Sequence, residues 1–489
     1  MKLFSNFKKE NYSTSTFLFI KFLALIYIVA FFSIATQITG LIGSKGILPI
    51  NEYLAGIKLQ YGQEALLKYP TIFLINSSDM SLKLIAYGGA AFGIFLFFES
   101  FPLFFLLILW LLYLSITIAG QIFFGYQWDY LLLEAGFLAI FLAPLATKIN
   151  TPFEPSKAMV IAFRILLFKL IFMSGVVKLT SGDTSWRDLT ALNYHFETQP
   201  LPNPLGYKIH HLSNEIHKIM CFLMLAIELI IPFFIFFGKR LRLIAFFSIT
   251  ALQIVIFLTG NYNFFNLLTI IISFFLLEDS TWSSILIKFK IQKKDKKKYK
   301  VIPESLASVL VIFIIFISLA QITNFHLAQG KLPNILYKTI QYTLPFRSIN
   351  TYGLFAIMTK TRPEVILEGS NDGRNWIPYE FKYKADRLDK RLPIIAPHQP
   401  RLDWQMWFLA LEDYRFNIWF LNFSKRILEG EKTVLDLLAK NPFPDSPPKY
   451  LRAVLYEYKF STVGELRSNG LRWKREFKKL YCPVLTNKN

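Results

Sequence analysis

The sequence predicts a polytopic α-helical membrane protein, with eight or nine transmembrane helices, followed by a soluble β-rich domain with added helices. Of the 489 residues, 53% are hydrophobic and only 18% are charged, which is too apolar for an ordinary soluble enzyme. Apolar runs of membrane-spanning length recur up to residue 323 and then stop. We therefore expect a transmembrane bundle over residues 1–323 and a soluble domain over residues 324–489.

A helix needs about 20 apolar residues to cross a hydrocarbon core about 30 Å thick. Nine runs are candidates, and two of them, Tyr130–Leu145 and Phe264–Leu277, are short. The first run follows three lysines, as in a signal peptide, but its length and the lack of an Ala-x-Ala site indicate an uncleaved span. The seven longer runs are Phe17–Ile38, Leu82–Phe98, Phe101–Ala119, Met159–Val177, Ile219–Phe237, Leu241–Thr259 and Leu306–Ile322.

The distribution of positive charge predicts the orientation, because Lys and Arg are retained on the cytoplasmic side. With a cytoplasmic N-terminus and nine spans, the inner segments carry sixteen Lys and Arg, eight of them between Lys288 and Lys300, and the outer loops carry five. The soluble domain then lies outside the cytoplasm. Attraction to anionic headgroups explains the basic run 287–300, so membrane lipid is an expected partner and nucleic acid is not.

Residues 324–489 carry 27 Lys and Arg against 16 Asp and Glu, with no further run of spanning length. Alternating apolar and polar residues predict strands, and prolines break two stretches that are typical of helices. The predicted strands are Tyr352–Thr359, Glu364–Glu368 and Trp376–Tyr383, and the predicted helices are Lys432–Lys440 and Lys449–Tyr458.

Charged residues inside spans are costly, so they mark either bundle contacts or a functional site. Asp129 and Glu134 lie in the fourth span, Arg164 and Lys169 in the fifth, and Glu228 in the sixth. Two acids that face two bases would neutralise one another in a buried ionic network. A substrate or proton path is the alternative.

Lys178 lies just beyond the fifth span, at the predicted non-cytoplasmic interface, and a polar outer loop over residues 179–215 follows it. We interpret Lys178 as a snorkelling lysine; a base with a pKa lowered by desolvation is the alternative. Three prolines between residues 200 and 204 force an extended backbone, so the surroundings must hold the polar side chains of the loop, which forms a candidate binding surface. Those side chains are His195, Glu197, Gln199 and Asn203.

No metal site is predicted. His195 and Glu197 lack a third ligand at a recognisable spacing. The chain has two cysteines, Cys221 and Cys482, which cannot form a disulfide framework or a cysteine-based zinc site. Whether these two cysteines pair stays open. No cofactor is expected.

The segment APHQPRLDWQMWF (396–408) mixes aromatic and charged residues, which suits either an interface with a client protein or core packing. Arg401 and Asp403 could alternatively pair and pin the soluble domain to the bundle or to the outer loop. The candidate client-binding residues are His398, Arg401, Asp403, Trp404 and Trp407.

Four strings carry a resemblance to a known family: LLLEAGFLAIFLAP (131–144), FMSGVVKLTSGDTSWRDLTALNYHFETQPLPNP (172–204), FAIMTKTRPEVILEGSNDGRNWIPYEFKYK (355–384) and APHQPRLDWQMWF. Together they resemble the lipase maturation factor family over most of the chain. The resemblance implies a polytopic membrane protein that assists the folding and assembly of secreted dimeric lipases, without known catalysis. The expected location is the endoplasmic reticulum, or the inner membrane for a bacterial homologue.

Two further resemblances concern single parts of the chain. The bundle resembles the membrane domain of vitamin K-dependent gamma-carboxylase, and the position that matches its catalytic lysine is Lys178. This implies an alternative function, a membrane enzyme that acts on a lipid or quinone-like substrate, with Lys178, His195 or Glu134 as catalytic candidates. The string VILEGSNDGRNW (365–376) is similar to a strand-turn-strand of discoidin-like β-sandwiches, so the soluble domain is expected to be sandwich-like.

The intramembrane charges also leave a transporter open, although no internal repeat or pair of broken helices supports one. We expect a maturation factor rather than an enzyme. A secreted client protein, such as a lipase, is the expected partner.

Overall fold

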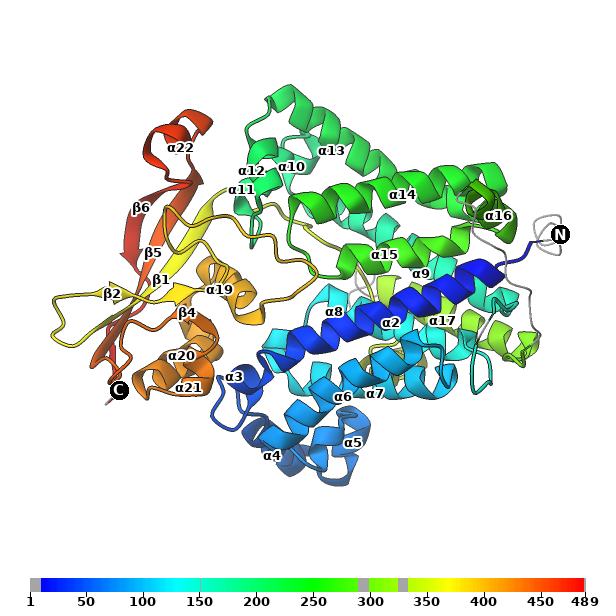
Figure 1. Ribbon diagram of the computed structural model, residues 1–489, viewed down its shortest axis with the longest axis horizontal. Helices are drawn as coiled ribbons and strands as arrows, with labels where there is room; N and C mark the ends of the chain where they lie inside the picture. Colours follow the sequence, from blue (N-terminus) through cyan, green and yellow to red (C-terminus); the bar gives the residue numbers. More distant parts are fainter. Residues whose placement is uncertain (1–9, 150, 289–298, 324–332, 488–489) are drawn as a thin grey trace.

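The computed structural model describes residues 10–149, 151–288, 299–323 and 333–487. A helical bundle occupies one side of the molecule, and the strands of the C-terminal region lie beyond one end of it (Figure 1). Most of the basic run 287–300 and the lysines before residue 10 lie outside the described residues.

Within the described residues, seven helical segments are long and apolar enough to cross a membrane. The two short runs form α8 (Gln127–Leu142) and α15 (Phe265–Ser273), which η6 (Phe274–Leu276) extends. At a rise of 1.5 Å per residue, the 16 residues of α8 span only about 24 Å. Length thus supports seven spans, and the expected count of eight or nine is not confirmed. The seven are α2 (Ser13–Ala35), α6 (Asp79–Phe97), α7 (Pro102–Ala119), α9 (Lys157–Thr180), α13 with η5 (Asn214–Phe236), α14 (Lys239–Thr259) and α17 (Glu304–Thr323).

Contacts between helix ends show which ends of the bundle helices lie together. The N–H of Phe101, before α7, donates to the carbonyl of Thr147, after α8, at 2.7 Å, and the N–H of Asp279 donates to the carbonyl of Asn11 at 2.9 Å. The first N–H groups of α9 donate to the carboxylate of Glu304, which begins α17, at 2.8 and 3.0 Å. The beginnings of α9 and α17 therefore meet, and α7 and α8 run in opposite directions.

Local chemistry explains where several helices begin. The Ser78 hydroxyl accepts the Ser81 N–H at the start of α6, and Pro102 occupies the first turn of α7, where its missing N–H costs nothing. Asn203 caps α12 (Pro204–His210) by accepting the Gly206 N–H. The span α7 carries no charged residue, so its stability depends on lipid and neighbouring helices rather than on one apolar face.

Short helices lie at the end of the bundle nearest the C-terminal region and along the adjoining side of α6 and α7 (Figure 1). Between α2 and α6 the chain forms α3 (Ile38–Ile42), α4 (Ile50–Tyr61), η2 (Gly62–Glu64), α5 (Ala65–Lys68) and η3 (Ile72–Leu74). The outer loop after α9 contains α10 (Thr184–Arg187), α11 (Leu192–Thr198) and α12. The helix α18 (Asn334–Thr343) precedes the strands.

The described strands of the C-terminal region form one antiparallel sheet in the order β2-β1-β5-β6, with β7 also paired to β5, and a separate ribbon of β3 and β4. Helix α19 packs against β1. The expected β-rich region is present, but a sandwich is not confirmed. The strands are β1 (Arg362–Ser370), β2 (Ile377–Pro378), β3 (Glu380–Phe381), β4 (Leu438–Lys440), β5 (Tyr450–Phe460), β6 (Trp473–Leu480) and β7 (Leu485–Thr486), and the helices are α19 (Arg401–Leu411), α20 (Ile418–Leu428), α21 (Lys432–Leu435) and α22 (Val463–Asn469).

Three sequence predictions in this region are wrong. The segment Lys449–Tyr458 was expected to be helical, yet it forms β5, because pairing with β1 on one side and β6 on the other places it inside the sheet. The predicted helix Lys432–Lys440 ends at Leu435 and continues into β4. The predicted strand Tyr352–Thr359 is an irregular segment, since no neighbouring strand pairs with it in the described part of the chain.

The turn between β1 and β2 explains Asn371, Asp372 and Gly373. The Asp372 carboxylate accepts the N–H groups of Arg374 and Asn375, each at 2.8 Å. Gly373 has a φ of +69°, which favours glycine. These residues therefore form the turn that their sequence predicts.

Candidate functional site

Buried charges concentrate where the bundle meets the C-terminal region. We call the contact zone that contains Asp129, Glu134, Lys178, Arg362 and Arg401 the junction. All five of these side chains are buried. A buried charge is tolerated only when it is paired and hydrogen-bonded, so the partner of each one shows what the junction does.

The first pair joins α19 to α8. Arg401 donates from both terminal nitrogens to the Asp129 carboxylate at 2.8 and 3.0 Å, and also to the carbonyl of Phe123 at 2.6 Å. The Tyr113 hydroxyl donates to the same carboxylate at 2.5 Å. Asp129 and Arg401 are 0% and 1% exposed. This two-pronged ion pair connects a bundle helix to the C-terminal region, which is the pinning role that the sequence left open for Arg401.

The second pair lies deeper between α8 and α9. Lys169 donates to Glu134 at 2.5 Å. The other carboxylate oxygen of Glu134 accepts the N–H of Asn350 at 3.0 Å and the hydroxyl of Tyr352 at 2.7 Å. Glu134 thus pairs with a neighbouring span and also holds the segment that leads into β1.

The third pair corrects the prediction of a snorkelling Lys178. Its ammonium group is buried and donates to both Glu228 oxygens, at 2.8 and 2.7 Å, and to the carbonyl of Ser174 at 3.1 Å. The nitrogen also lies 5.4 Å from the centre of the Trp186 ring. An ammonium group has three donors, and these contacts engage all of them. The geometry therefore adds no support for Lys178 as a catalytic base.

Arg164 lies apart from these pairs, where it donates to the carbonyl of Phe275 at 3.0 Å and to the hydroxyl of Tyr12 at 2.5 Å. The five charged residues predicted as one intramembrane network therefore belong to four separate sets of contacts. Glu134 and Lys169 pair as the sequence suggests, whereas Asp129 and Glu228 have partners outside that set.

The side chains of the proline-rich outer loop point inward and are held by neighbouring elements. Gln199 donates to the carbonyl of Thr259 at 3.0 Å, and Asn203 donates to that of Leu258 at 2.9 Å. The Glu197 carboxylate accepts the N–H of Phe460, in β5, at 2.5 Å. Burial raises the pKa of Glu197. These contacts join the loop to α14 and to the sheet, so the loop is a structural bridge rather than an open surface.

His195 lies in the same loop, beside an aromatic group. Its Nε2 is 3.3 Å from the hydroxyl of Tyr262, and the ring of Phe355 meets it edge-on with centres 5.1 Å apart. Burial, together with the positive charge of Lys178, lowers the pKa of His195 to about 4. The imidazole is therefore neutral at neutral pH, and its contacts are those of a packed side chain.

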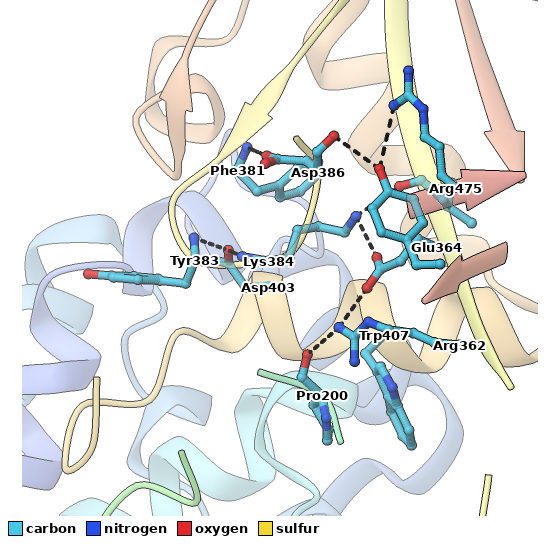
Figure 2. Close-up of polar contacts among 12 residues, drawn as sticks. Pro200, Arg362, Glu364, Phe381, Tyr383, Lys384, Asp386, Asp403, Trp407 and Arg475 are labelled. Atoms are coloured by element: carbon cyan, nitrogen blue, oxygen red, sulfur yellow. Dashed lines mark hydrogen bonds and ion pairs between the residues drawn. The ribbon is translucent and has the colours of Figure 1, made fainter. Parts of the chain in front are cut away.

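A charged cluster on β1 was not predicted from the sequence (Figure 2). Arg362 donates to the carbonyls of Glu197, Gln199 and Pro200 at 2.8, 2.6 and 3.1 Å. It also pairs with Glu364 at 2.7 Å, and Lys384 lies 2.7 Å from the other Glu364 oxygen. Arg362 thereby clamps the backbone of the proline loop onto β1.

The sequence holds only a weak signal for this cluster. Arg362 and Glu364 are two residues apart on a strand, so they lie on the same face, where they resemble an exposed ion pair. Their function depends on three backbone carbonyls, which no side-chain pattern reveals. Asn350 and Tyr352, the partners of Glu134, were also missed. They lie far from Glu134 in the sequence, so no local pattern connects them to it.

The candidate client-binding residues on and before α19 are largely internal, which favours the core-packing alternative for this segment. Arg401, Asp403 and Trp404 are buried, and His398 and Trp407 are partly buried. A side chain enclosed by its own protein has no free surface to offer to a client. Arg401 and Asp403 do not pair with each other, since each has another partner in the junction.

Each of these side chains has an internal contact. Asp403 accepts the N–H groups of residues 383 and 384 at 2.7 and 2.9 Å, as Figure 2 shows, and burial raises its pKa to about 6. Trp404 meets Trp128 edge-on, with ring centres 4.8 Å apart. Trp407 donates to the carbonyl of Thr198 at 2.8 Å, and His398 Nδ1 lies 2.9 Å from the Ser33 hydroxyl. The segment therefore anchors the C-terminal region to the bundle.

The chemistry of the junction is that of a rigid connection. Its charges are neutralised in pairs that cross between elements, and its polar side chains hold backbone groups. Among the described residues, no three His, Cys, Asp or Glu side chains gather to hold a metal ion. Cys221 and Cys482 are both free and buried.

Comparisons with known proteins cover both parts of the chain. The family model for the lipase maturation factor transmembrane domain matches residues 14–284, and the one for the lipase maturation factor C-terminal domain matches residues 348–483. The chain is 33% identical over 506 residues to lipase maturation factor 1 of Bos taurus, across 96% of this chain and 88% of the relative. It is 32% identical over 584 residues to lipase maturation factor 2 of Homo sapiens, across 96% and 82%. No solved structure matches the chain.

Proposed function

Because the chain belongs to the lipase maturation factor family, we propose that it is a membrane-bound factor that assists the folding and assembly of secreted lipases or related exported proteins. The observation that carries the proposal is the match to both the transmembrane and the C-terminal model of the family. The relatives are named for lipase maturation, and their similarity extends over 96% of this chain.

The junction supports a specific form of this role. A factor that acts on a folding client gains from a surface held in a fixed position, because a preorganised surface loses less entropy on binding. The pair Asp129–Arg401, the hydrogen bonds of Asn350 and Tyr352 to Glu134, and the Arg362 clamp hold the C-terminal region against the bundle. In this proposal the bundle anchors the protein in the membrane, and the C-terminal region binds the client.

The client surface must use exposed residues, since Arg401, Asp403 and Trp404 are enclosed. Two large apolar side chains project where α20 begins: Phe416, two residues before the helix, is 81% exposed, and Ile418, the first residue of the helix, is also exposed. Exposed apolar groups of this size are typical of binding surfaces. The C-terminal region is also basic, with 27 Lys and Arg against 16 Asp and Glu, which favours an acidic client surface.

For the location, we propose a multi-pass protein of the endoplasmic reticulum membrane, or of the inner membrane in a bacterium, with the N-terminus in the cytoplasm. The positive charges near the start of α9 and α14 support this orientation, since they lie at the end of the bundle away from the C-terminal region. The C-terminal region is then lumenal or periplasmic, where a secreted client folds.

The experiment uses cells that lack their own lipase maturation factor and that express a dimeric secreted lipase such as lipoprotein lipase. Expression of this chain should raise the lipase activity in the medium for each unit of lipase protein, because more of the lipase is correctly assembled. Secretion of an unrelated monomeric protein is the control and should not change. Unaltered lipase activity, with the chain present in membranes at normal abundance, would refute the proposal.

A pair of variants tests the client surface in the same cells. Phe416→Ser combined with Ile418→Ser should reduce the specific activity of the secreted lipase without changing the abundance of the factor. Ile394→Ser is the matched control, because Ile394 is 80% exposed on a different loop. An equal loss of activity in both variants would argue against a surface centred on Phe416.

A further inference from the structure

The segment between α3 and α6 packs against the side of α7 rather than beyond its end. The Thr71 hydroxyl donates to the carbonyl of Ser115 at 3.1 Å, and the N–H of Ile72 donates to the Ser115 hydroxyl at 3.1 Å. Ser115 lies four residues before Ala119, the last residue of α7, which is about 6 Å along the helix axis. The segment therefore reaches the depth of the last turn of a spanning helix.

The face of α7 that holds this segment is exposed nearer the start of the helix, as expected for a face of a spanning helix that lipid covers. Leu107, Leu111 and Ser115 are spaced by four residues, so they lie along one side of the helix. Leu107 and Leu111 are exposed leucines on a span that lacks charged residues. The segment thus continues the lipid-facing surface of α7 toward the end of the bundle, and in Figure 1 α4 and α5 lie at the outer edge of the bundle beside α6 and α7.

The outer surface of the segment exposes four large apolar side chains, next to polar ones such as Gln63 and Glu64. Leu59 is 89% exposed and Ile75 is 88% exposed, and more than half of Leu66 and of Leu67 is exposed. Exposing four large apolar side chains within 17 residues to water is unfavourable. Burial of the same side chains in lipid would be favourable.

The residues beside this apolar surface are those typical of a membrane interface. Three tyrosines form a cluster, with ring centres 6.4 Å apart for Tyr53 and Tyr69 and 5.6 Å apart for Tyr61 and Tyr69. The Lys68 nitrogen lies 4.7 Å from the centre of the Tyr61 ring, and Lys58 is exposed. Tyrosine is enriched at the headgroup level, and lysine reaches from apolar surface to the headgroups.

We propose that residues 59–75 insert into the headgroup and upper acyl layer of the leaflet on the side of the C-terminal region. The exposed Leu59, Leu66, Leu67 and Ile75 contact lipid chains, while the tyrosines and the two lysines lie at the headgroups. The occupant of this surface is a lipid monolayer, because the surface is continuous with the lipid-facing side of α7. This inference does not depend on the proposed role in lipase maturation.

The test measures the depth of nitroxide labels in the full chain, reconstituted in vesicles of phosphatidylcholine and phosphatidylserine. Both native cysteines are buried, so single Leu59→Cys and Ile75→Cys variants provide the reactive thiols. Electron paramagnetic resonance compares collisions with oxygen, which partitions into the bilayer, with collisions with a water-soluble nickel chelate. Phe247→Cys, exposed within the span α14, is the bilayer reference, and Asp445→Cys, exposed in the C-terminal region, is the water reference.

Labels at residues 59 and 75 should collide more with oxygen than with nickel, as the label at residue 247 does. Leu67→Cys offers an independent position if one label disturbs folding. Labels that collide with nickel as freely as the label at residue 445 would overturn the proposal, since the surface would then face water or another protein.

Discussion

Asp129 lies in the first turn of α8, where its carboxylate is completely removed from solvent. An ionised group in such a place needs full compensation. Arg401 supplies the charge, and Tyr113 supplies a further hydrogen bond. The same rule accounts for Lys178, whose ammonium group would be costly without Glu228. At the scale of single residues, the junction is a set of charges that each require one particular partner.

Replacing Asp129 by Asn should destabilise the protein severely. The substitution keeps the size of the side chain but leaves the buried guanidinium of Arg401 without a counter-charge, a loss of about 3–5 kcal/mol for a buried pair. We expect a lower thermal unfolding midpoint for the purified protein in detergent and a lower abundance in membranes.

Asp413→Asn is the matched control. Asp413 also pairs with an arginine, Arg415, but both side chains are exposed to solvent, so the midpoint should not change measurably. The double variant Asp129→Leu with Arg401→Met should recover part of the lost stability, because it removes both charges together. An Asp129→Asn protein with the wild-type midpoint would show that the pair does not hold the junction.

At the scale of elements, α3 and α21 show how closely the two parts of the chain approach. A Cβ atom at Gly40 would overlap the backbone carbonyl of Thr433 and lie 2.8 Å from the Cγ of Leu437. Gly40 belongs to α3, beside the bundle, and Thr433 belongs to α21, in the C-terminal region. The absence of a side chain at this position lets the two helices meet backbone to backbone.

Gly40→Ala should therefore weaken the contact between α3 and α21. The obstacle is backbone rather than a flexible side chain, so one helix must shift, at a cost of about 1–3 kcal/mol. The thermal midpoint of the purified protein should fall, and protease should cleave the C-terminal region more readily.

The matched control is Gly56→Ala in α4, where a Cβ atom meets nothing within 4 Å. There alanine should be neutral or stabilising by about 0.5–1 kcal/mol, since glycine is unfavourable inside a helix. Equal midpoints for the two variants would mean that α3 and α21 are not tightly packed.

At the scale of the whole molecule, the bundle has one end with basic residues and another that meets the C-terminal region. Lys157, Lys239 and Arg242 belong to the first turns of α9 and α14. Contacts of Arg242 with Glu10 and of the α9 N-terminus with Glu304 place these turns beside the starts of α2 and α17. If the positive residues face the cytoplasm, as we propose, the C-terminal region must lie on the opposite side of the membrane.

Glycosylation mapping tests this orientation. Leu471→Thr completes an Asn-x-Thr acceptor at Asn469, which is exposed at the end of α22. The chain has native acceptors at Asn11, Asn76 and Asn422, so the unaltered chain is the reference. Expression in a eukaryotic cell should add one further glycan to the Leu471→Thr variant and produce a band slower than that of the unaltered chain, a difference that endoglycosidase abolishes. A control chain with Asn-Gly-Thr inserted after Lys294, in the basic run, should gain no glycan beyond those of the unaltered chain. The reverse pattern would invert the proposed topology.

The sequence predicted part of the fold and little of the site. The runs long enough to cross a membrane became the seven long apolar helices, because burial of an apolar helix in lipid depends mainly on its own composition and length. The helix expected at Lys449–Tyr458 became β5, because strand pairing with β1 and β6 overrides a local preference.

By itself, the sequence determined the family, the membrane class of the protein and the existence of buried intramembrane charges, since all three depend on residue type and local order. Only the tertiary structure decided which partners those charges take. Arg401 lies 272 positions from Asp129 and Arg362 lies 165 positions from Glu197, and both depend on where distant elements pack. The type of a residue indicates that it will need a counter-charge if it is buried. Only the packing of the chain brings that counter-charge within 3 Å.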